Sequence, residues 1–293
     1  MSVRRETLQI ARLAPTLLGN SADLVASFVR ARLNADGGFG NRAGDSDLYY
    51  SVFGLQALLA LRVDPPMSVV AAYLRRFGDG HGLDFVHLAC LAGCWAMMPE
   101  SELALEVRLG LLDRLEVYRT PEGGYHASRG ASHGSAYHAF LAIGAYQDLG
   151  AAPQDPQRVV ASLSALRSAD GGFANDPGRP RGSTPATAAA VTLIRHLDMP
   201  AEPGLADWLF SRCANGGFFA SADAPLPDLL STATALHALT SLHAPLDGIR
   251  EACLDFVDSL WTSQGSFYAT WADDTPDCEY TFYGLLALGH LAV

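Results

Sequence analysis

The sequence predicts an all-α fold in which helical hairpins close into an (α/α)6 toroid. A Gly-Gly-aromatic motif recurs along the 293 residues at 37, 123, 171 and 216, with a weaker copy, Gly-His-Gly-Leu, at 80 and a degraded one, Gly-Ser-Phe, at 265. The copies are 43 to 49 residues apart, which is the length of one helical hairpin. Hydrophobic residues make up 49% of the chain and the six units share one hydrophobic pattern. We therefore expect residues 1–293 to form a single domain.

Each unit is expected to hold two helices of different polarity. The helix before the glycines is amphipathic and should lie outside, whereas the helix after them is apolar on most faces and should be buried inside the ring. The glycines should break the chain between them, and the aromatic should fill the core below the turn. Residues 1–20 would add a leading helix. The expected outer helices are 21–33, 66–76, 103–116, 156–167, 205–213 and 249–263, and the inner ones 49–61, 85–97, 134–149, 184–197, 229–242 and 278–291.

The last unit decides between an open superhelix and a closed ring. A stacked solenoid needs polar capping repeats at its ends. Residues 285–293 read Leu-Leu-Ala-Leu-Gly-His-Leu-Ala-Val, which is not a polar cap and favours closure. In a closed ring the inner helices begin at one common mouth, where their dipoles favour an anion.

The composition argues against several classes of protein. The chain has 20 Lys and Arg against 31 Asp and Glu, a net charge of −11 that argues against nucleic-acid binding. It contains no lysine, which excludes Schiff-base chemistry and Walker-type phosphate binding. The sequence has no uncharged apolar run of about 18 residues, so we expect no transmembrane helix. The first residues do not resemble a secretion signal. The five scattered cysteines favour free thiols and a cytoplasmic location.

Two segments connect the repeat to a known family. Residues 47–58 read Asp-Leu-Tyr-Tyr-Ser-Val-Phe-Gly-Leu-Gln-Ala-Leu, and residues 277–288 read Asp-Cys-Glu-Tyr-Thr-Phe-Tyr-Gly-Leu-Leu-Ala-Leu. This pattern resembles the prenyltransferase/squalene-cyclase repeat over about the whole chain, and the single-domain length looks most like a protein prenyltransferase β subunit. The resemblance implies a prenyl diphosphate or similar apolar small molecule in a central cavity. It leaves open a helical α-type partner subunit or a homodimer.

The resemblance implies three zinc ligands, and this sequence has only one of them. Asp228 stands where the family has its Asp, but Leu230 replaces the Cys and Tyr280 replaces the His. Leucine cannot coordinate a metal and tyrosine is a poor substitute for histidine. We therefore expect a zinc-independent, prenyltransferase-like protein. Asp273 and Asp274 could instead hold Mg²⁺, a hard cation that prefers oxygen ligands.

Other residues are candidates for contact with a diphosphate at the mouth. The segment Ser-His-Gly around His133 resembles the family's diphosphate-binding start, and Arg129, Arg179 and Arg181 are the nearest arginines. These arginines could equally be solvated loop residues. Aligned on their ends, the inner helices begin at polar residues that also suit helix N-caps: Asp47, Asp84, His133, Ser183, Asp228 and Asp277.

The start of the last inner helix offers an alternative function. Residues 277–281, Asp-Cys-Glu-Tyr-Thr, fall in the register of the Asp-x-Asp-Asp-Thr motif of class II terpene cyclases, with Glu279 in the place of the acid and Asp277 in that of the first Asp. Neighbouring carboxylates could raise the pKa of one of them. The alternatives to a prenyltransferase-like enzyme are thus a small class II cyclase-like enzyme and a non-catalytic isoprenoid-binding or scaffold protein.

Aromatic residues are the candidates for the cavity wall. Tyr49, Tyr50, Tyr280 and Tyr283 lie on inner helices, and Trp271 lies in the last polar loop. Aromatic faces suit an isoprenoid chain and stabilise cations. The alternative is that these residues belong to the ordinary core between inner and outer helices.

Overall fold

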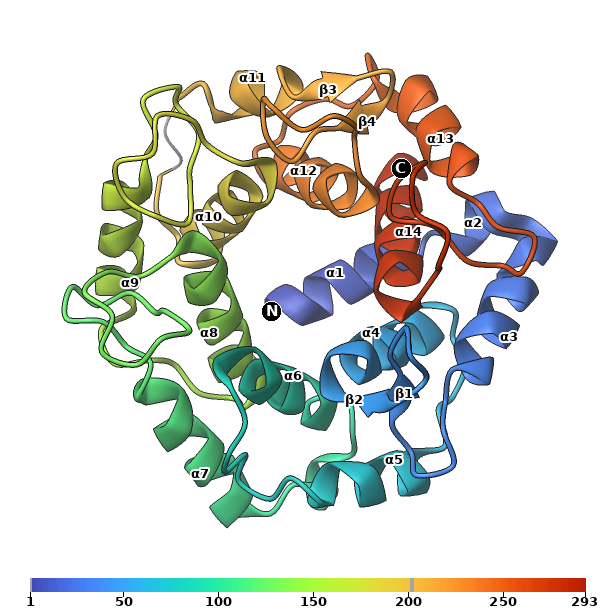
Figure 1. Cartoon of the computed structure of the whole chain (residues 1–293), viewed down its shortest axis with the longest axis vertical. Coiled ribbons are helices and arrows are strands. Elements are labelled where there is room, and N and C mark those ends of the chain that lie inside the picture. The colour runs from blue at the N-terminus through green and yellow to red at the C-terminus, as the bar shows by residue number, and fades with distance from the viewer. Residues whose placement is uncertain (1, 201–202) are drawn as a thin grey trace.

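The computed structural model describes residues 2–200 and 203–293, and it confirms the predicted all-α toroid. Each inner helix packs against the next, and the last packs against the first, so that the ring closes (Figure 1). The inner helices are α4 (Leu48–Ala60), α6 (Phe85–Trp95), α8 (Ala136–Asp148), α10 (Thr184–His196), α12 (Leu229–Ser241) and α14 (Cys278–Leu291). The outer helices are α3 (Ala22–Ala31), α5 (Met67–Arg75), α7 (Leu105–Glu116), α9 (Pro156–Leu163), α11 (Leu205–Phe210) and α13 (Arg250–Ser259).

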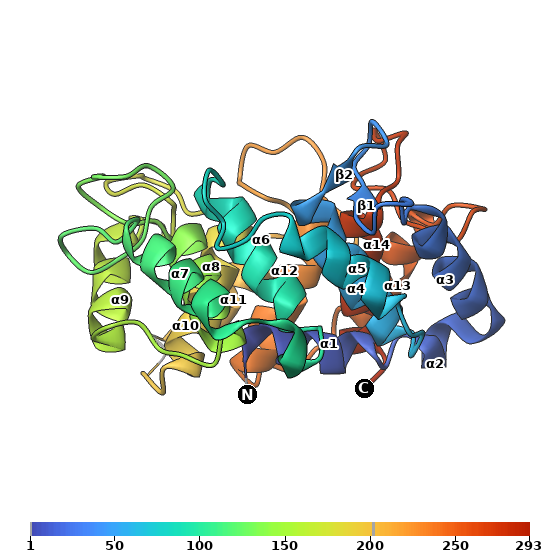
Figure 2. The ribbon, with the colours of Figure 1, turned by 90° about the horizontal axis from the view of Figure 1, so that it is seen from below.

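The inner helices all begin at the face of the ring that carries the long polar loops (Figure 2). A polar side chain at each start accepts hydrogen bonds from backbone N–H groups of the first turn, which is ordinary N-capping. The third cap corrects the sequence alignment, because Ser135 caps α8 and His133 stands two residues before it. The caps are Asp47, Asp84, Ser135, Ser183, Asp228 and Asp277.

The aromatic residues of the Gly-Gly motifs fill the space between the two helix rings. Phe39, Tyr125, Phe173, Phe218 and Phe267 are all buried. Two of these turns form short antiparallel pairs, β1 (Phe39–Gly40) with β2 (Ser46–Asp47) and β3 (Cys213–Ala214) with β4 (Gly217–Phe218). Gly37 has a φ of 95°, and a Cβ there would lie 2.2 Å from the carbonyl oxygen of Val69. Only glycine fits this turn.

The N-terminal helix α1 (Val3–Ala11) crosses the end of the ring opposite the mouth and packs against α4, α8 and α14 (Figures 1 and 2). The leading helix expected over 1–20 is broken, since α2 (Pro15–Leu18) and a 3-10 turn (Gly19–Ser21) follow α1; residue 1 lies outside the described residues. Further 3-10 turns cover Glu100–Glu102 and Ser164–Leu166. Arg4 anchors α1 through an ion pair with Asp148 at 2.9 Å. Helix α1 therefore forms the floor of the ring. Among the described helices, none combines the length and apolar character that crossing a membrane requires.

Candidate functional site

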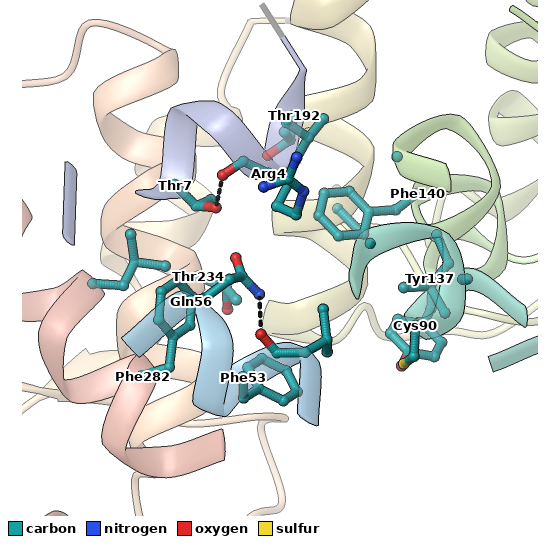
Figure 3. A pocket seen from close by; sticks show the side chains of 18 of the residues that line it. Arg4, Thr7, Phe53, Gln56, Cys90, Tyr137, Phe140, Thr192, Thr234 and Phe282 are labelled. Atoms are coloured by element: carbon teal, nitrogen blue, oxygen red, sulfur yellow. Dashed lines mark hydrogen bonds between the residues drawn. The ribbon is translucent and has the colours of Figure 1, made fainter. Parts of the chain in front are cut away.

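A cavity of about 310 Å³ lies inside the ring, between the inner helices and α1 (Figure 3). This volume is at the lower end of the range of about 300–1,000 Å³ for small-molecule sites. Tyr49 and Tyr283 line the cavity, as the sequence predicted for aromatic residues of the inner helices. The other aromatic lining residues are Phe53, Tyr137, Phe140 and Phe282.

The cavity changes character along its depth. Its aromatic side chains lie on the first two turns of the inner helices, towards the mouth. Gln56, Thr192 and His237 lie about one turn beyond Phe53, and Thr234 lies at the level of Phe53. Tyr49 and Gln56 are on the same helix, and a rise of about 1.5 Å per residue separates them by about 10 Å along its axis. The polar lining residues from the level of Thr234 down to α1, called the polar floor below, are Arg4, Thr7, Gln56, Asp148, Thr192, Thr234 and His237.

A second, polar hollow adjoins the mouth, and Tyr50 and Tyr280 lie in its wall. Arg42 organises it, because its Nε donates to Asp277 at 2.8 Å while Nη1 and Nη2 donate to the two oxygens of Asp273 at 3.0 and 2.9 Å. Burial acts to raise the pKa of Asp273, but the hydrogen bonds from Arg42 outweigh it and lower that pKa. Asp273 and Asp277 therefore neutralise the positive charge of Arg42.

Glu279 lies between this polar hollow and the central cavity. Its side chain lines the polar hollow and only 7% of the residue is exposed. Its Oε1 accepts a hydrogen bond of 2.6 Å from the hydroxyl of Tyr49, which lines the cavity. Among the described residues, no other side chain hydrogen-bonds this carboxyl.

The pKa of Glu279 reflects this isolation. The pKa of Glu279 is raised to about 7, mainly because the carboxyl is buried, and the charge of Asp277 adds to this effect. The hydrogen bond from Tyr49 and the charge of Arg42 act in the opposite direction and lower the pKa. Burial also holds the pKa of Tyr49 far above its usual value, so that its hydroxyl remains a donor. Asp277 caps α14 by accepting from the N–H of Tyr280. The site thus contains a buried carboxyl that is half protonated near neutral pH.

The residues present at the expected zinc position do not fit that metal. Asp228 caps α12 and accepts from both N–H and Oγ of Ser231. Leu230 belongs to the cavity wall and Tyr280 to the polar hollow. In residues 2–200 and 203–293 there is no group of three or more His, Cys, Asp or Glu side chains arranged to hold a metal ion. Asp274 accepts a hydrogen bond from its neighbour Thr275.

The candidate diphosphate ligands are spread over the loops and are not assembled at the mouth. Arg179 and Arg181 form exposed ion pairs with Asp176 and Asp223, and Arg129 lies over the ring of Tyr118. The ring of His133 contacts that of His126. None of these four candidates lines the central cavity or the polar hollow.

Two further predicted site residues have structural partners. Trp271 donates its Nε1–H to Ser259 and packs against Phe256 of α13, so it belongs to the outer ring. Asp47 caps α4 and approaches Nε2 of His87 at 3.5 Å.

Sequence analysis missed Arg42 and the polar floor. Arg42 meets Asp277 across 235 positions of the chain, a contact that exists only because the ring closes. Gln56, Thr192 and Thr234 appear in the sequence as single polar residues in apolar helices. A signal was nevertheless present, because Gln56 follows Tyr49 by seven residues and a helix returns to nearly the same face after two turns.

Comparison with known proteins agrees with this architecture. The chain is similar along almost its whole length to the type II terpene cyclase MstE from Scytonema, with 13% identity, a TM-score of 0.64 and coverage of 97% of this chain and 98% of that one. A variant of that cyclase has been solved with its substrate geranylgeranyl dihydroxybenzoate. The protein geranylgeranyltransferase-I of Candida albicans is 14% identical, with a TM-score of 0.53 and coverage of 97% and 83%.

The fold also occurs in enzymes of a different chemistry. An α-1,6-mannanase of Salegentibacter is 13% identical, with a TM-score of 0.60 and coverage of 94% of this chain and 98% of that one. These likenesses show the fold alone. No curated protein matches the sequence. The prenyltransferase alpha-alpha toroid domain matches residues 14–79, 115–204 and 187–292. Because these matches cover most of the chain, the protein belongs to the prenyltransferase alpha-alpha toroid domain family.

Proposed function

We propose that the protein is an acid-initiated cyclase of isoprenoid alkenes in which Glu279 is the proton donor. The observation that carries this proposal is the position of a buried carboxyl with a pKa of about 7 at the mouth of an aromatic cavity. A general acid works best when its pKa lies near the working pH. The isoprenoid substrate of the similar cyclase MstE is consistent with such a ligand.

The reaction begins with an alkene at the junction of the two hollows. A new C–H bond forms as the O–H bond of Glu279 breaks, and the alkene π electrons leave a carbocation on the neighbouring carbon. A second double bond of the same chain attacks this carbon and closes a ring. Loss of a proton from the last carbocation to water ends the sequence, so that the product is an isomer of the substrate.

The surrounding residues support each step. The hydroxyl of Tyr49 donates to Glu279 and stabilises the carboxylate that remains after proton transfer. The faces of Phe53, Tyr137 and Phe140 line the cavity where the carbocation would move, and aromatic faces attract cations. The polar hollow gives Glu279 a route to solvent through which it regains its proton.

A transferase that ionises a prenyl diphosphate, the function favoured by the sequence alone, needs cations around the leaving group. Arg42 is the arginine in the polar hollow, and it is already paired with two aspartates. We therefore expect the activity to require neither zinc nor a diphosphate, and Mg²⁺ at Asp273 and Asp274 to be dispensable.

The test is product analysis after incubation with polyprenyl alcohols, esters and diphosphates. Glu279→Gln keeps the size of the side chain but cannot deliver a proton in the same way, and it should reduce cyclisation by a factor of about 10² to 10⁴. Asp274→Asn is the matched control, because this rim carboxylate bonds only to Thr275 among the described residues. Release of diphosphate by the wild type would indicate a transferase instead, and binding without turnover would indicate a non-catalytic binder.

A further inference from the structure

Apart from Arg4, the polar floor presents acceptors rather than donors to the cavity. The hydroxyls of Thr7, Thr192 and Thr234 each donate to a carbonyl of their own helix, at 3.0, 2.9 and 2.7 Å. A hydroxyl has one proton to give, so only lone pairs remain on these three oxygens. The three side chains belong to α1, α10 and α12 and all line the cavity (Figure 3).

Gln56 of α4 adds a stronger acceptor to the same cavity (Figure 3). Its Nε2 donates to the carbonyl oxygen of Val52 at 3.3 Å. Only the amide nitrogen can donate to a carbonyl, so this contact fixes the orientation and leaves Oε1 as the free atom. Only 6% of Gln56 is exposed, and its Oε1 has no hydrogen-bond partner among the described residues. A purely apolar ligand would leave this buried oxygen unpaired, which is unfavourable.

The protonation of His237 follows from a chain of hydrogen bonds at the same end. Thr240 donates its hydroxyl proton to Leu236, so it must accept from Nδ1 of His290 at 3.2 Å. Nε2 of His290 then carries no proton and accepts from Nδ1 of His237 at 3.1 Å. Nε2 of His237 is consequently a further acceptor; it is buried and has no partner among the described residues. Burial lowers the pKa of His237 to about 4, which keeps its ring neutral.

Charges at this end select the kind of donor that could bind. Arg4 spends Nε on Asp148 and Nη2 on the carbonyl of Ala96, and its Nη1 is the remaining donor. Arg4 is paired with Asp148, so the polar floor carries no net charge. An ammonium, carboxylate or phosphate of a ligand would therefore be buried there without a counter-ion, which is unfavourable. A neutral hydroxyl can donate to one of these oxygens and accept from Arg4.

We infer that the polar floor binds a hydroxyl group of the substrate, so that the substrate is an isoprenoid alcohol or prenylated phenol whose hydroxyl lies at the end remote from the alkene protonated at the mouth. This inference rests on the proposed function only in placing that alkene beside Glu279. The separation of Tyr49 and Gln56, about 10 Å along α4, sets the spacing between the two ends. Gln56 and Thr234 then determine specificity, and Glu279 determines reactivity.

The experiment compares two probes that differ in one hydrogen-bond donor, farnesol and its methyl ether. Binding to the full chain is measured by isothermal titration calorimetry. We expect the wild type to bind farnesol at least tenfold more tightly than the ether. Gln56→Leu and Thr234→Val should each reduce this ratio towards one by weakening farnesol binding, with little change for the ether. Thermal melting shows that each variant is folded, and the two variants remove acceptors from different helices.

Two outcomes would overturn the inference: equal binding of the two probes by the wild type, or a preference for farnesol that survives both substitutions. Equal binding would mean that bound water satisfies these acceptors. Failure of the proposed function looks different, because it is seen in turnover. Glu279→Gln should retain the full preference for farnesol while losing cyclisation, so a protein that prefers farnesol but never cyclises would refute the acid role and leave the hydroxyl site standing.

Discussion

Glu279 at the mouth and Glu6 at the floor are two largely buried glutamates at opposite ends of one ring. Burial acts to raise the pKa of both. Glu6 hydrogen-bonds His196 at 2.8 Å and Arg195, and these partners lower its pKa to about 2. Among the described residues, the one side chain that hydrogen-bonds Glu279 is the neutral hydroxyl of Tyr49, and the pKa of Glu279 rises to about 7. The difference shows that directly bonded basic partners decide whether a buried carboxyl holds the fold together or carries a proton.

The pH dependence of turnover should show the largest effect of this difference. The active form of Glu279 is protonated, and it is fully populated well below its pKa of about 7. Cyclisation should therefore fall about tenfold per pH unit above pH 7, or roughly a hundredfold by pH 9. The measurement is kcat/KM between pH 5 and pH 9.

A variant sharpens this measurement. The hydrogen bond from Tyr49 lowers the pKa of Glu279, so Tyr49→Phe should move the midpoint of the profile to higher pH. A rate that increases with pH through 7 would mean that the ionised carboxylate is the active form, as expected for a base.

The wild type should lose stability relative to Glu279→Gln as the pH rises. The pKa of Glu279 is raised on folding, from 4.5 to about 7, so its contribution is present below pH 4.5 and is lost as the pH rises through 7. At 1.36 kcal/mol per pKa unit, the wild type should lose about 3 kcal/mol that the variant keeps. Urea unfolding of both proteins at pH 4.5 and pH 8 measures the difference, and a constant difference would show that folding does not raise the pKa of Glu279.

Glu6→Gln should have the opposite dependence. The pKa of Glu6 is lowered on folding, so its contribution is present above pH 4.5 and disappears as the pH falls towards 2. Removing the hydrogen bonds of the charged Glu6 carboxylate should cost about 2 kcal/mol at pH 7. Glu251→Gln is the control, because the Glu251 side chain is 89% exposed. If Glu6→Gln unfolds at the same urea concentration as the wild type, α1 is not held by this carboxylate.

Sequence alone predicted the ring because its signals are local and repeated. The glycine turns and the apolar second helices recur in each unit, and the buried aromatics in five of the six, with little dependence on distant contacts. One signal was misread: Ser135 follows Tyr125 by ten residues, as Asp228 follows Phe218 and Asp277 follows Phe267. That spacing identifies Ser135, and not His133, as the cap of α8.

The site could be predicted only in part. Glu279 was found because its motif is contiguous in the sequence, and Tyr49 because it is an aromatic on an inner helix. That Tyr49 donates to Glu279 depends on α4 meeting α14, which closes the ring. The role of Arg42 depends on the same closure, since it reaches Asp277 from the first loop. Contacts between the first and last units have no local sequence signal.

Substitutions of Asp277 should have the smallest effects. Comparing two of them separates the role of Asp277 as a helix cap from the effect of its charge. It caps α14 through Oδ1, at 2.9 Å from the N–H of Tyr280, and its Oδ2 accepts from Arg42. Asp277→Ala removes the cap and should cost about 1 kcal/mol, while Arg42 keeps both bonds to Asp273. Asp277→Asn is the matched variant, because asparagine caps a helix equally well but carries no charge. Its amide nitrogen cannot accept from Arg42, so both variants lose that hydrogen bond while only Asp277→Asn keeps the cap. Asp277→Asn should therefore be more stable than Asp277→Ala by about 1 kcal/mol, which measures the cap.

Both variants should nevertheless lower the pKa of Glu279. The charge of Asp277 raises the pKa of Glu279 and that of Arg42 lowers it. Without the carboxylate of Asp277, the midpoint of the pH–rate profile should move below 7 in Asp277→Asn and in Asp277→Ala alike. If Asp277→Asn leaves the midpoint unchanged, the charge of Asp277 does not reach Glu279. The buried position of Glu279 alone would then account for its proton at neutral pH.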